Sequence, residues 1–269
     1  MKKLLALLLA LVMVFALVAC GAEEEETDKT DKTEETEETE ETTTAPVETT
    51  EATEEETTDE VTEPEEEVTV MTFEEYMAAE LETAVVIECA VQGNQSWWDN
   101  KITVYGADEN GGYFMYEMAC SEEDAAKLTQ GTWIRVTGVK KEWEGMTEIM
   151  DCTFEFIEKE PYVAEATDVT ELLGSDELIN KTALPVVFTG MTVEAVEFQN
   201  GEPGKDIYLT VKSGEETYNF CVESYLTGTD TEVYTVVSAL EAGAVIDITA
   251  YVYWYQGLNP HIIGVNTVA

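Results

Sequence analysis

Two stretches of the sequence decide the fold: GTWIRVTGVKKEWEG at residues 131–145 and GAVIDITAYVYWYQG at residues 243–257. They align without a gap, and apolar residues alternate with polar ones at the same positions in both. A period of two is typical of β-strands with one buried face. Because Gly131 meets Gly243 and Gly145 meets Gly257, the match indicates an internal repeat.

The segments around each stretch follow the same order of strand, strand, strand, helix and hairpin. In the first copy we expect strands at 84–92, 101–107 and 113–118, a helix at 120–131, and a hairpin turning at 144–146. In the second copy we expect strands at 184–198, 206–213 and 216–222, a helix at 231–243, and a last hairpin. A further short helix is predicted at 72–80, where Thr72 and Glu75 have capping-box spacing.

Five strands with one helix in about 90 residues resemble the OB-fold, a small five-stranded Greek-key barrel. The predicted fold class is therefore all-β with short helices, as two tandem OB-like barrels at residues 71–160 and 161–269. The whole chain resembles uncharacterised surface lipoproteins of anaerobic Gram-positive bacteria (Firmicutes type) that carry OB-like modules behind an acidic spacer. The resemblance implies no assigned reaction and no catalytic residue.

The first twenty residues, MKKLLALLLALVMVFALVAC, predict a lipoprotein signal peptide. Two lysines precede an apolar run at 4–18, which is too short to remain as a membrane-spanning helix. Leu17-Val18-Ala19-Cys20 resembles the bacterial lipobox, in which the thiol of Cys20 is lipidated. We therefore expect a palmitate-type anchor in the cell membrane, with the rest of the chain on the extracytoplasmic side.

Residues 21–70 are dominated by Glu and Thr and contain no aromatic residue, which predicts a disordered acidic spacer. Glycosylation of its threonines and loose binding of divalent cations are alternatives to a plain spacer. Residues 71–269 are also acidic, with 35 Asp and Glu against 9 Lys and Arg. A field of that sign repels phosphate backbones, so nucleic acid is predicted to be an unlikely partner.

The sequence contains no catalytic or metal-binding motif. Its only histidine, His261, lies in the last hairpin and is expected to make only local hydrogen bonds. Cys89 and Cys152 both fall on inward-facing strand positions, where a disulfide bridge and two free thiols are equally compatible with the spacing. We therefore predict that the protein is not an enzyme and uses no cofactor and no metal.

Aromatic and amide side chains are concentrated where OB-like barrels bind ligands, on the second and third strands and in two loops. Rings beside amides are typical of surfaces that stack on sugars or capture peptide side chains, although the same rings can cap the barrel as core. The candidate ligand-binding residues are Trp97, Trp98, Asn100, Tyr105, Trp143, Trp254, Tyr255 and Asn259.

Together these features predict a non-catalytic, membrane-anchored binding module outside the cell. Its expected ligand is a carbohydrate, a cell-wall fragment or a protein. The alternative is a structural or assembly protein of the cell envelope, in which the barrels mediate protein-protein contacts.

Overall fold

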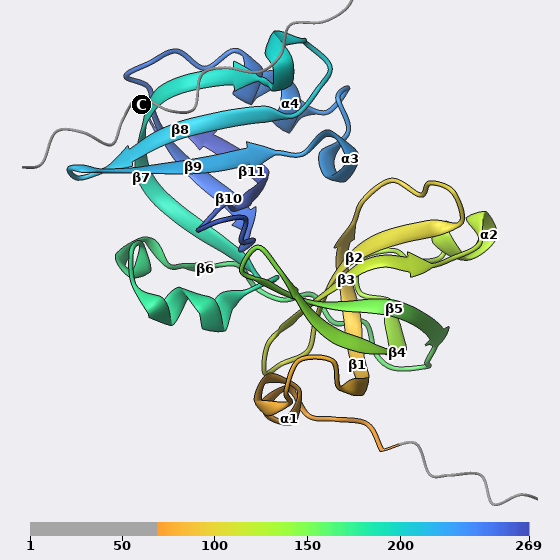
Figure 1. Ribbon diagram of the computed structural model, residues 1–269. Coiled ribbons are helices and arrows are strands. Elements are labelled where there is room, and N and C mark those ends of the chain that lie inside the picture. Colours follow the sequence, from red (N-terminus) through yellow and green to blue (C-terminus); the bar gives the residue numbers. More distant parts are fainter. Residues whose placement is uncertain (1–68, 269) are drawn as a thin grey trace, which may run out of the picture. The chain divides into compact units, whose positions relative to one another are not determined.

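The computed structural model describes residues 69–268, which all belong to one compact unit. The predicted signal peptide, the lipidation of Cys20 and the spacer up to residue 68 lie outside the described residues. Within residues 69–268, no helix combines the length and the apolar character that crossing a membrane requires. The described chain is mostly β-structure with a few short helices, so the predicted all-β class is confirmed (Figure 1).

The first half of the described chain is a closed five-stranded barrel. Its strands run in the order β1-β2-β3-β5-β4, and β4 pairs back to β1. All pairings are antiparallel except that of β3 with β5, in which Met115 lies opposite Ile149. The strands are β1 (Ala84–Asn94), β2 (Lys101–Ala107), β3 (Gly112–Ala119), β4 (Trp133–Trp143) and β5 (Met146–Phe156). The predicted five-stranded barrel is thus confirmed for this half.

Two short helices complete the first half. In α1 (Phe73–Ala78) the predicted capping box is present, with Thr72 and Glu75 bonded to each other's backbone. Lys140 then closes the end of α1, because its buried Nζ donates to the carbonyl oxygens of residues 76, 77 and 79 at 2.9, 2.9 and 2.7 Å. Helix α2 (Glu122–Ala125) is a single turn, shorter than predicted, and the chain then turns toward Gly131.

The second half is a six-stranded sheet in the order β10-β11-β9-β8-β7-β6, in which β10 also pairs with β7. The strands are β6 (Thr167–Asp168), β7 (Pro185–Phe198), β8 (Ile207–Ser213), β9 (Glu216–Val222), β10 (Val245–Tyr251) and β11 (His261–Thr267). The helical segments are α3 (Ser224–Thr227) and α4 (Glu232–Ser238), with 3₁₀ turns η1 (Thr170–Leu172), η2 (Asp176–Lys181) and η3 (Gln199–Gly201). Strand β6, α3 and the 3₁₀ turns were not predicted.

The two copies of the repeat share a specific backbone contact. The amide of Gly131 donates to the carbonyl of Val91 at 2.8 Å, and the amide of Gly243 donates to that of Val193 at 2.8 Å. Both glycines have a positive φ, +91° and +92°, which a residue without Cβ adopts at little cost. The alignment of residues 131–145 with 243–257 therefore corresponds to equivalent backbone geometry at the start of β4 and of β10.

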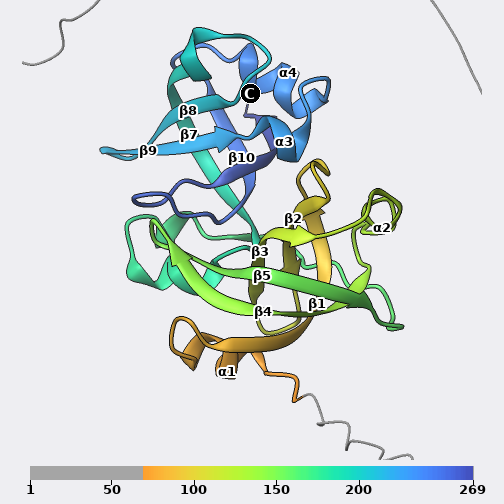
Figure 2. The same cartoon turned by 45° about the vertical axis from the view of Figure 1, so that its right-hand side comes forward.

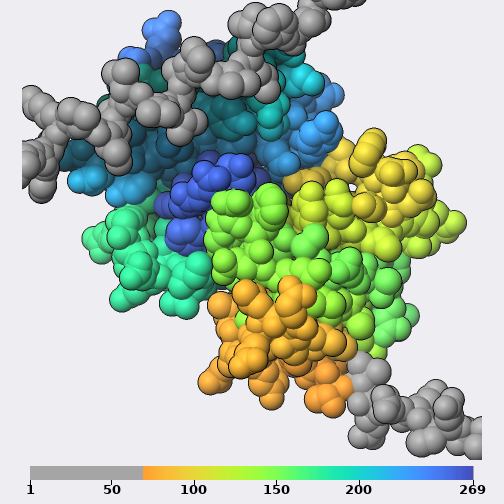
Figure 3. Space-filling view, viewed as in Figure 1, coloured from red at the N-terminus to blue at the C-terminus, as the bar shows by residue number. Residues whose placement is uncertain are grey.

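A third apolar cluster, which we call the junction, lies between the two halves. It consists of Tyr105, Phe114, Met146, Ala183 and Tyr251, with Tyr116, Leu226, Tyr253, Trp254 and Ile263 packed around it. The loop after β10 reaches the β4–β5 turn, where the amide of Gln256 donates to the carbonyl of Glu144 at 2.8 Å. Figure 2 shows this loop beside the β4–β5 hairpin, and in Figure 3 the blue C-terminal residues lie directly against the green ones.

Candidate functional site

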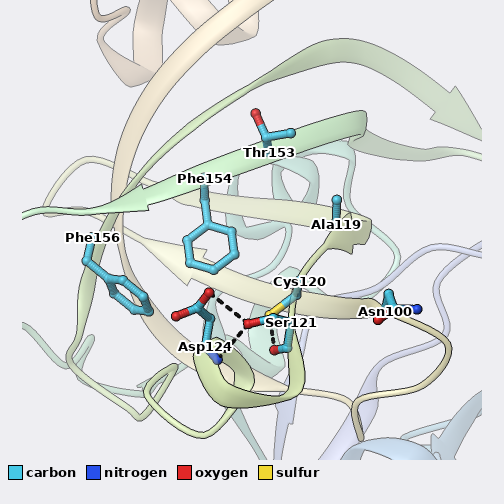
Figure 4. A pocket seen from close by; sticks show the side chains of 8 residues that line it. All are labelled: Asn100, Ala119, Cys120, Ser121, Asp124, Thr153, Phe154 and Phe156. Carbon is cyan, nitrogen blue, oxygen red and sulfur yellow. Dashed lines mark hydrogen bonds between the residues drawn. The ribbon is translucent and has the colours of Figure 1, made fainter. Parts of the chain in front are cut away.

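A pocket with a volume of about 450 Å³ opens on the first barrel. We call it the Phe154 pocket (Figure 4). Its walls come from the end of β3, from α2, from β5 and from the turn before β2. The lining residues are Asn100, Ala119, Cys120, Ser121, Asp124, Thr153, Phe154 and Phe156.

Asn100 reaches the pocket because it belongs to a tight two-residue turn. Trp98 and Lys101 exchange backbone hydrogen bonds of 3.0 and 2.9 Å, and Asp99 and Asn100 between them both have positive φ, +48° and +60°. Asp and Asn tolerate this left-handed conformation better than other residues with a side chain. The carbonyl of Asn100 accepts from the amide of Cys120 at 2.9 Å, which ties the turn to the end of β3.

A carboxylate lies on the side of the pocket formed by α2. Ser121 caps α2, and its hydroxyl donates to Asp124 Oδ2 at 2.8 Å, while Lys127 Nζ donates to Oδ1 at 3.0 Å. The hydrogen bonds from Lys127 and then Ser121 lower the pKa of Asp124. Asp124 is therefore ionised at neutral pH.

Two phenyl rings from β5 form the opposite wall. Phe154 and Phe156 are two residues apart and so project from the same face of the strand. Their ring centroids are 5.2 Å apart with an interplanar angle of 85°, and Figure 4 shows the Phe154 ring above Asp124 and the Phe156 ring to its left. Phe154 packs on the barrel core, whereas 39% of Phe156 is exposed. The pocket therefore combines aromatic surface with one negative charge.

The thiol in the pocket is not activated. Cys120 Sγ donates to the carbonyl of Ser121 at 3.2 Å, and burial raises the pKa of Cys120 to about 11. All four cysteines of the described chain are free and buried, so Cys89 and Cys152 are not bridged. Within residues 69–268 no three His, Cys, Asp or Glu residues gather into a group that could hold a metal ion.

The candidate residues of the first barrel are divided between its core and its surface. Trp97 packs against the core, and its Nε1 donates to the carbonyl of Cys120 at 2.8 Å behind the Phe154 pocket. Trp98 and Trp143 are exposed at 69% and 56%. Tyr105 is fully buried in the junction, where its hydroxyl lies 2.7 Å from His261 Nδ1.

The candidate residues of the second half lie in the loop between β10 and β11. Trp254 is packed between the core of this half and the junction, and its Nε1 donates to Thr182 Oγ1 at 2.9 Å. Tyr255 is 51% exposed, and the amide of Asn259 closes the loop by donating to the carbonyl of Tyr253 at 2.9 Å. Of the eight candidates, only Asn100 lines the Phe154 pocket.

Sequence reasoning missed Asp124, Phe154 and Phe156 as site residues. His261 also differs from expectation, because its hydrogen bond reaches Tyr105 in the other half rather than a local partner. The sequence signal for the pocket is an aromatic pair, Phe154 and Phe156, at the last positions of a strand.

No family model matches the chain, and no curated protein matches it. Among solved structures it is similar to one described as murine DNA binding protein bound with ds DNA, at 12% identity and a TM-score of 0.35, over 68% of this chain and 96% of the other. It is also similar to the Ifi202 HINa domain in complex with 20bp dsDNA, at 13% identity and a TM-score of 0.33, over 69% and 98%. A replication protein A heterotrimer bound to ssDNA matches at 11% identity and a TM-score of 0.32, over 74% and 52%.

These comparisons correct two predictions. All three descriptions name DNA, and none names a carbohydrate, a cell-wall fragment or a protein ligand, so the predicted extracellular ligands and the assembly alternative are withdrawn. The exclusion of nucleic acid is withdrawn as well. Its physical weakness is that net charge belongs to the whole chain, whereas a ligand meets one face. No residue role is carried over from these structures.

Proposed function

We propose that the Phe154 pocket binds a small organic cation that carries an apolar group. The observation that supports this ligand class is the presence of two phenyl rings and an ionised carboxylate in one pocket. A volume of about 450 Å³ falls within the range of about 300–1,000 Å³ usual for small-molecule sites.

The aromatic wall favours a cation over a neutral ligand of the same shape. The face of a phenyl ring is electron-rich, and a cation above it gains about 0.5–1 kcal/mol at an exposed site and about 2 kcal/mol when desolvated. Phe156 offers an exposed ring for this contact, and Phe154, packed on the core, holds it in place.

The carboxylate favours the same class of ligand. Asp124 is already paired with Lys127, but the Lys127 side chain is 51% exposed, and such pairs contribute only about 0–1 kcal/mol. A ligand ammonium can therefore displace Lys127 at little cost. The 35 acidic residues in 71–269 also raise the local concentration of cations.

The proposed role of the pocket is binding without catalysis. A thiol with a raised pKa is a poor nucleophile, and an ionised Asp124 held by two donors is a weak base.

The proposal is tested by titrating the full chain with benzyltrimethylammonium while recording amide chemical shifts. We expect saturable shifts around residues 119–124 and 153–156, with a dissociation constant on the order of 1 mM. Phe156→Leu and Asp124→Asn should each weaken binding severalfold. Lys127→Gln should strengthen it, because the carboxylate loses its internal competitor.

Phenylacetate is the matched anion, and Trp143→Leu removes an exposed ring outside the pocket as the control variant. Equal binding of phenylacetate would overturn the choice of a cation. Unchanged binding by Phe156→Leu would place the ligand elsewhere. A duplex or single-stranded DNA oligonucleotide that shifts the same amides more tightly than the amine would replace the proposed ligand class.

For the fold, we propose that the second half is a second OB-like barrel, with domains at 71–160 and 161–269. The pairing of β10 with β7 and the shared contacts of Gly131 and Gly243 support this proposal. A fragment of residues 161–269 should then fold by itself. A fragment that stays unfolded would mean that the second half depends on the first.

For the cellular location, we propose an exported lipoprotein of the Gram-positive surface type, anchored through Cys20. The lipobox-like residues 17–20 and the acidic spacer support this. Cys20→Ala should release the chain from the membrane fraction. Retention of the variant in the membrane would contradict the anchor.

A further inference from the structure

Two buried carboxyl groups lie at the junction, one from each half. Glu223 follows β9 in the second half, and Glu148 lies on β5 in the first half, two residues from Met146 of the junction cluster and on the same face of the strand. Glu148 is 3% exposed, and the side chain of Glu223 is 16% exposed. Burying a carboxylate is costly unless it is paired, so the partners of each decide its behaviour.

Glu223 has partners that can share a proton with it. Both of its oxygens accept from Gln95 Nε2, at 2.7 and 2.9 Å, and Oε2 lies 3.4 Å from His261 Nδ1. His261 is stacked on Tyr253 at 4.1 Å and bonded to Tyr105. Burial raises the pKa of Glu223 to about 7 and lowers that of His261 to about 3.

The Glu223–His261 pair adds no pH dependence of its own to the junction near neutrality. At pH 5.5, with the halves together, the pair holds one proton, and that proton is on Glu223. If the halves separated at pH 5.5, the pair would still hold one proton, now on His261 beside an ionised Glu223. Because the number of protons bound by the pair does not change when the halves separate, the pair does not make that separation depend on pH.

Glu148 has no such partner. The groups that face it from the surrounding elements are Tyr76 of α1, Tyr116 of β3, Lys141 of β4, Cys152 of β5 and Tyr253 of the β10–β11 loop. Lys141 is the only cation among them, and its Nζ binds Asp151 at 3.1 Å. Burial raises the pKa of Glu148 to about 7, and Lys141 opposes this only in part.

We propose that the protonation state of Glu148 controls whether the two halves stay together at the junction, which we therefore call a latch. Glu223 and His261 add no pH dependence to this latch. With Glu148 protonated, the β10–β11 loop covers a neutral side chain and the halves stay together. When Glu148 ionises, the loop covers an unpaired charge, and separation that lets water reach the carboxylate becomes easier. The latch therefore loosens as pH rises from about 4.5 to 7. This range lies between the pKa of a free glutamate and the raised pKa of the buried Glu148.

Two backbone amides report the latch directly. Ser96 donates to the carbonyl of Tyr225 at 2.7 Å, and Gln256 donates to that of Glu144 at 2.8 Å, each across the junction. In the full chain, hydrogen exchange of these amides, corrected for intrinsic rates, should be about 10- to 100-fold less protected at pH 8 than at pH 5. The amides of Gly131 and Gly243, bonded within each half, should keep their protection and serve as controls.

Glu148→Gln keeps the size and the neutral state, and should abolish the pH dependence at Ser96 and Gln256. Glu223→Gln should reduce, but not abolish, the loss of protection between pH 5 and 8, because an unshared His261 with a lowered pKa favours separation at pH 5. The latch would be overturned if the protection of these amides did not change with pH in the wild type, or if its change with pH persisted in Glu148→Gln. If Glu148→Gln does not fold, carboxyl ¹³C titration of the wild type decides, because a Glu148 pKa near 4.5 would also overturn it.

Discussion

The β4–β5 and β10–β11 hairpins start with the same glycine contact and then diverge. In the first, β4 runs to Trp143, and the turn closes at once through Glu144 and Gly145, both with positive φ. In the second, β10 stops at Tyr251, because the next residue, Val252, exchanges hydrogen bonds with Ala183 and Leu184 instead of β11. The residues that would extend the second hairpin form the loop that packs into the junction.

This difference shows how one sequence pattern serves two purposes. The turn residues of the first hairpin are exposed, whereas the second hairpin and its loop supply Tyr251, Tyr253 and His261 to the junction. Tyr251 stacks on Tyr105 at 4.4 Å with an interplanar angle of 14°, and its hydroxyl donates to the carbonyl of Gln92 at 2.7 Å. The second copy of the repeat thus contacts the first half through the residues that follow β10, which is shorter than the equivalent strand β4.

The largest effect is expected from removing that ring. Tyr251→Ala should lower the free energy of unfolding by about 3–5 kcal/mol, because a buried aromatic side chain leaves a cavity at the junction. Denaturant unfolding of the full chain measures this. Tyr251→Phe keeps the stack and loses only the bond to Gln92, so it should cost about 1 kcal/mol. Equal costs for the two variants would mean that the ring contributes nothing.

The two junction carboxyls provide the second test. The raised pKa of Glu148 means that the wild type loses stability relative to Glu148→Gln as pH rises from about 4.5 to 7, by about 3 kcal/mol at pH 8. Below pH 4.5 the free energies of unfolding of the wild type and Glu148→Gln should differ by an amount that does not change with pH. Glu223→Gln should act in the opposite direction, because an unshared His261 with a lowered pKa costs stability as pH falls below about 6.5. Thermal unfolding across pH 4 to 8 compares the three proteins.

The repeat-equivalent glycines provide a third comparison with a smaller effect. Gly131→Ala and Gly243→Ala each place a Cβ at positive φ, which costs about 1–2 kcal/mol. A Cβ at Gly131 would also lie 3.2 Å from Pro161 Cβ, whereas one at Gly243 meets open space. We expect the Gly131 variant to lose about 1 kcal/mol more in chemical denaturation. A larger loss for Gly243→Ala would show that the two sites are not equivalent.

Strand β4 of the first barrel was predictable because its buried residues alternate with more exposed ones, and a period of two records that in the sequence. Strand β2 does not follow this pattern, because it is buried on both faces from Ile102 to Ala107. In β5, a strict period of two predicts that Met150 faces inward with Cys152, but the structure differs. Asp151 has a φ of +50°, and the register with β4 shifts there, so Ile149 and Cys152 are buried and Met150 is not. A bulge of this kind follows from the pairing of strands and has no local signal.

The junction and the Phe154 pocket were not predictable for a related reason. Tyr105 and His261 are 156 residues apart, and their alternation with neighbours shows that they face one side of a sheet but not what covers that side. Trp97 and Trp254 were expected at a ligand surface, yet each indole finds its hydrogen-bond partner within the chain. Polar partners of aromatic residues depend on tertiary contacts, which a single sequence does not display.

The smallest effect is expected where the two hairpins remain alike at the surface. Trp143 and Tyr255 occupy equivalent positions in residues 131–145 and 243–257, and both are more than half exposed. Trp143→Ala and Tyr255→Ala should each change the free energy of unfolding by less than about 0.5 kcal/mol. The bond between Gln256 and Glu144 joins backbone atoms and survives both substitutions. A loss above 1 kcal/mol for Tyr255→Ala alone, in the same denaturation assay, would show that its ring helps to hold the loop against the first half.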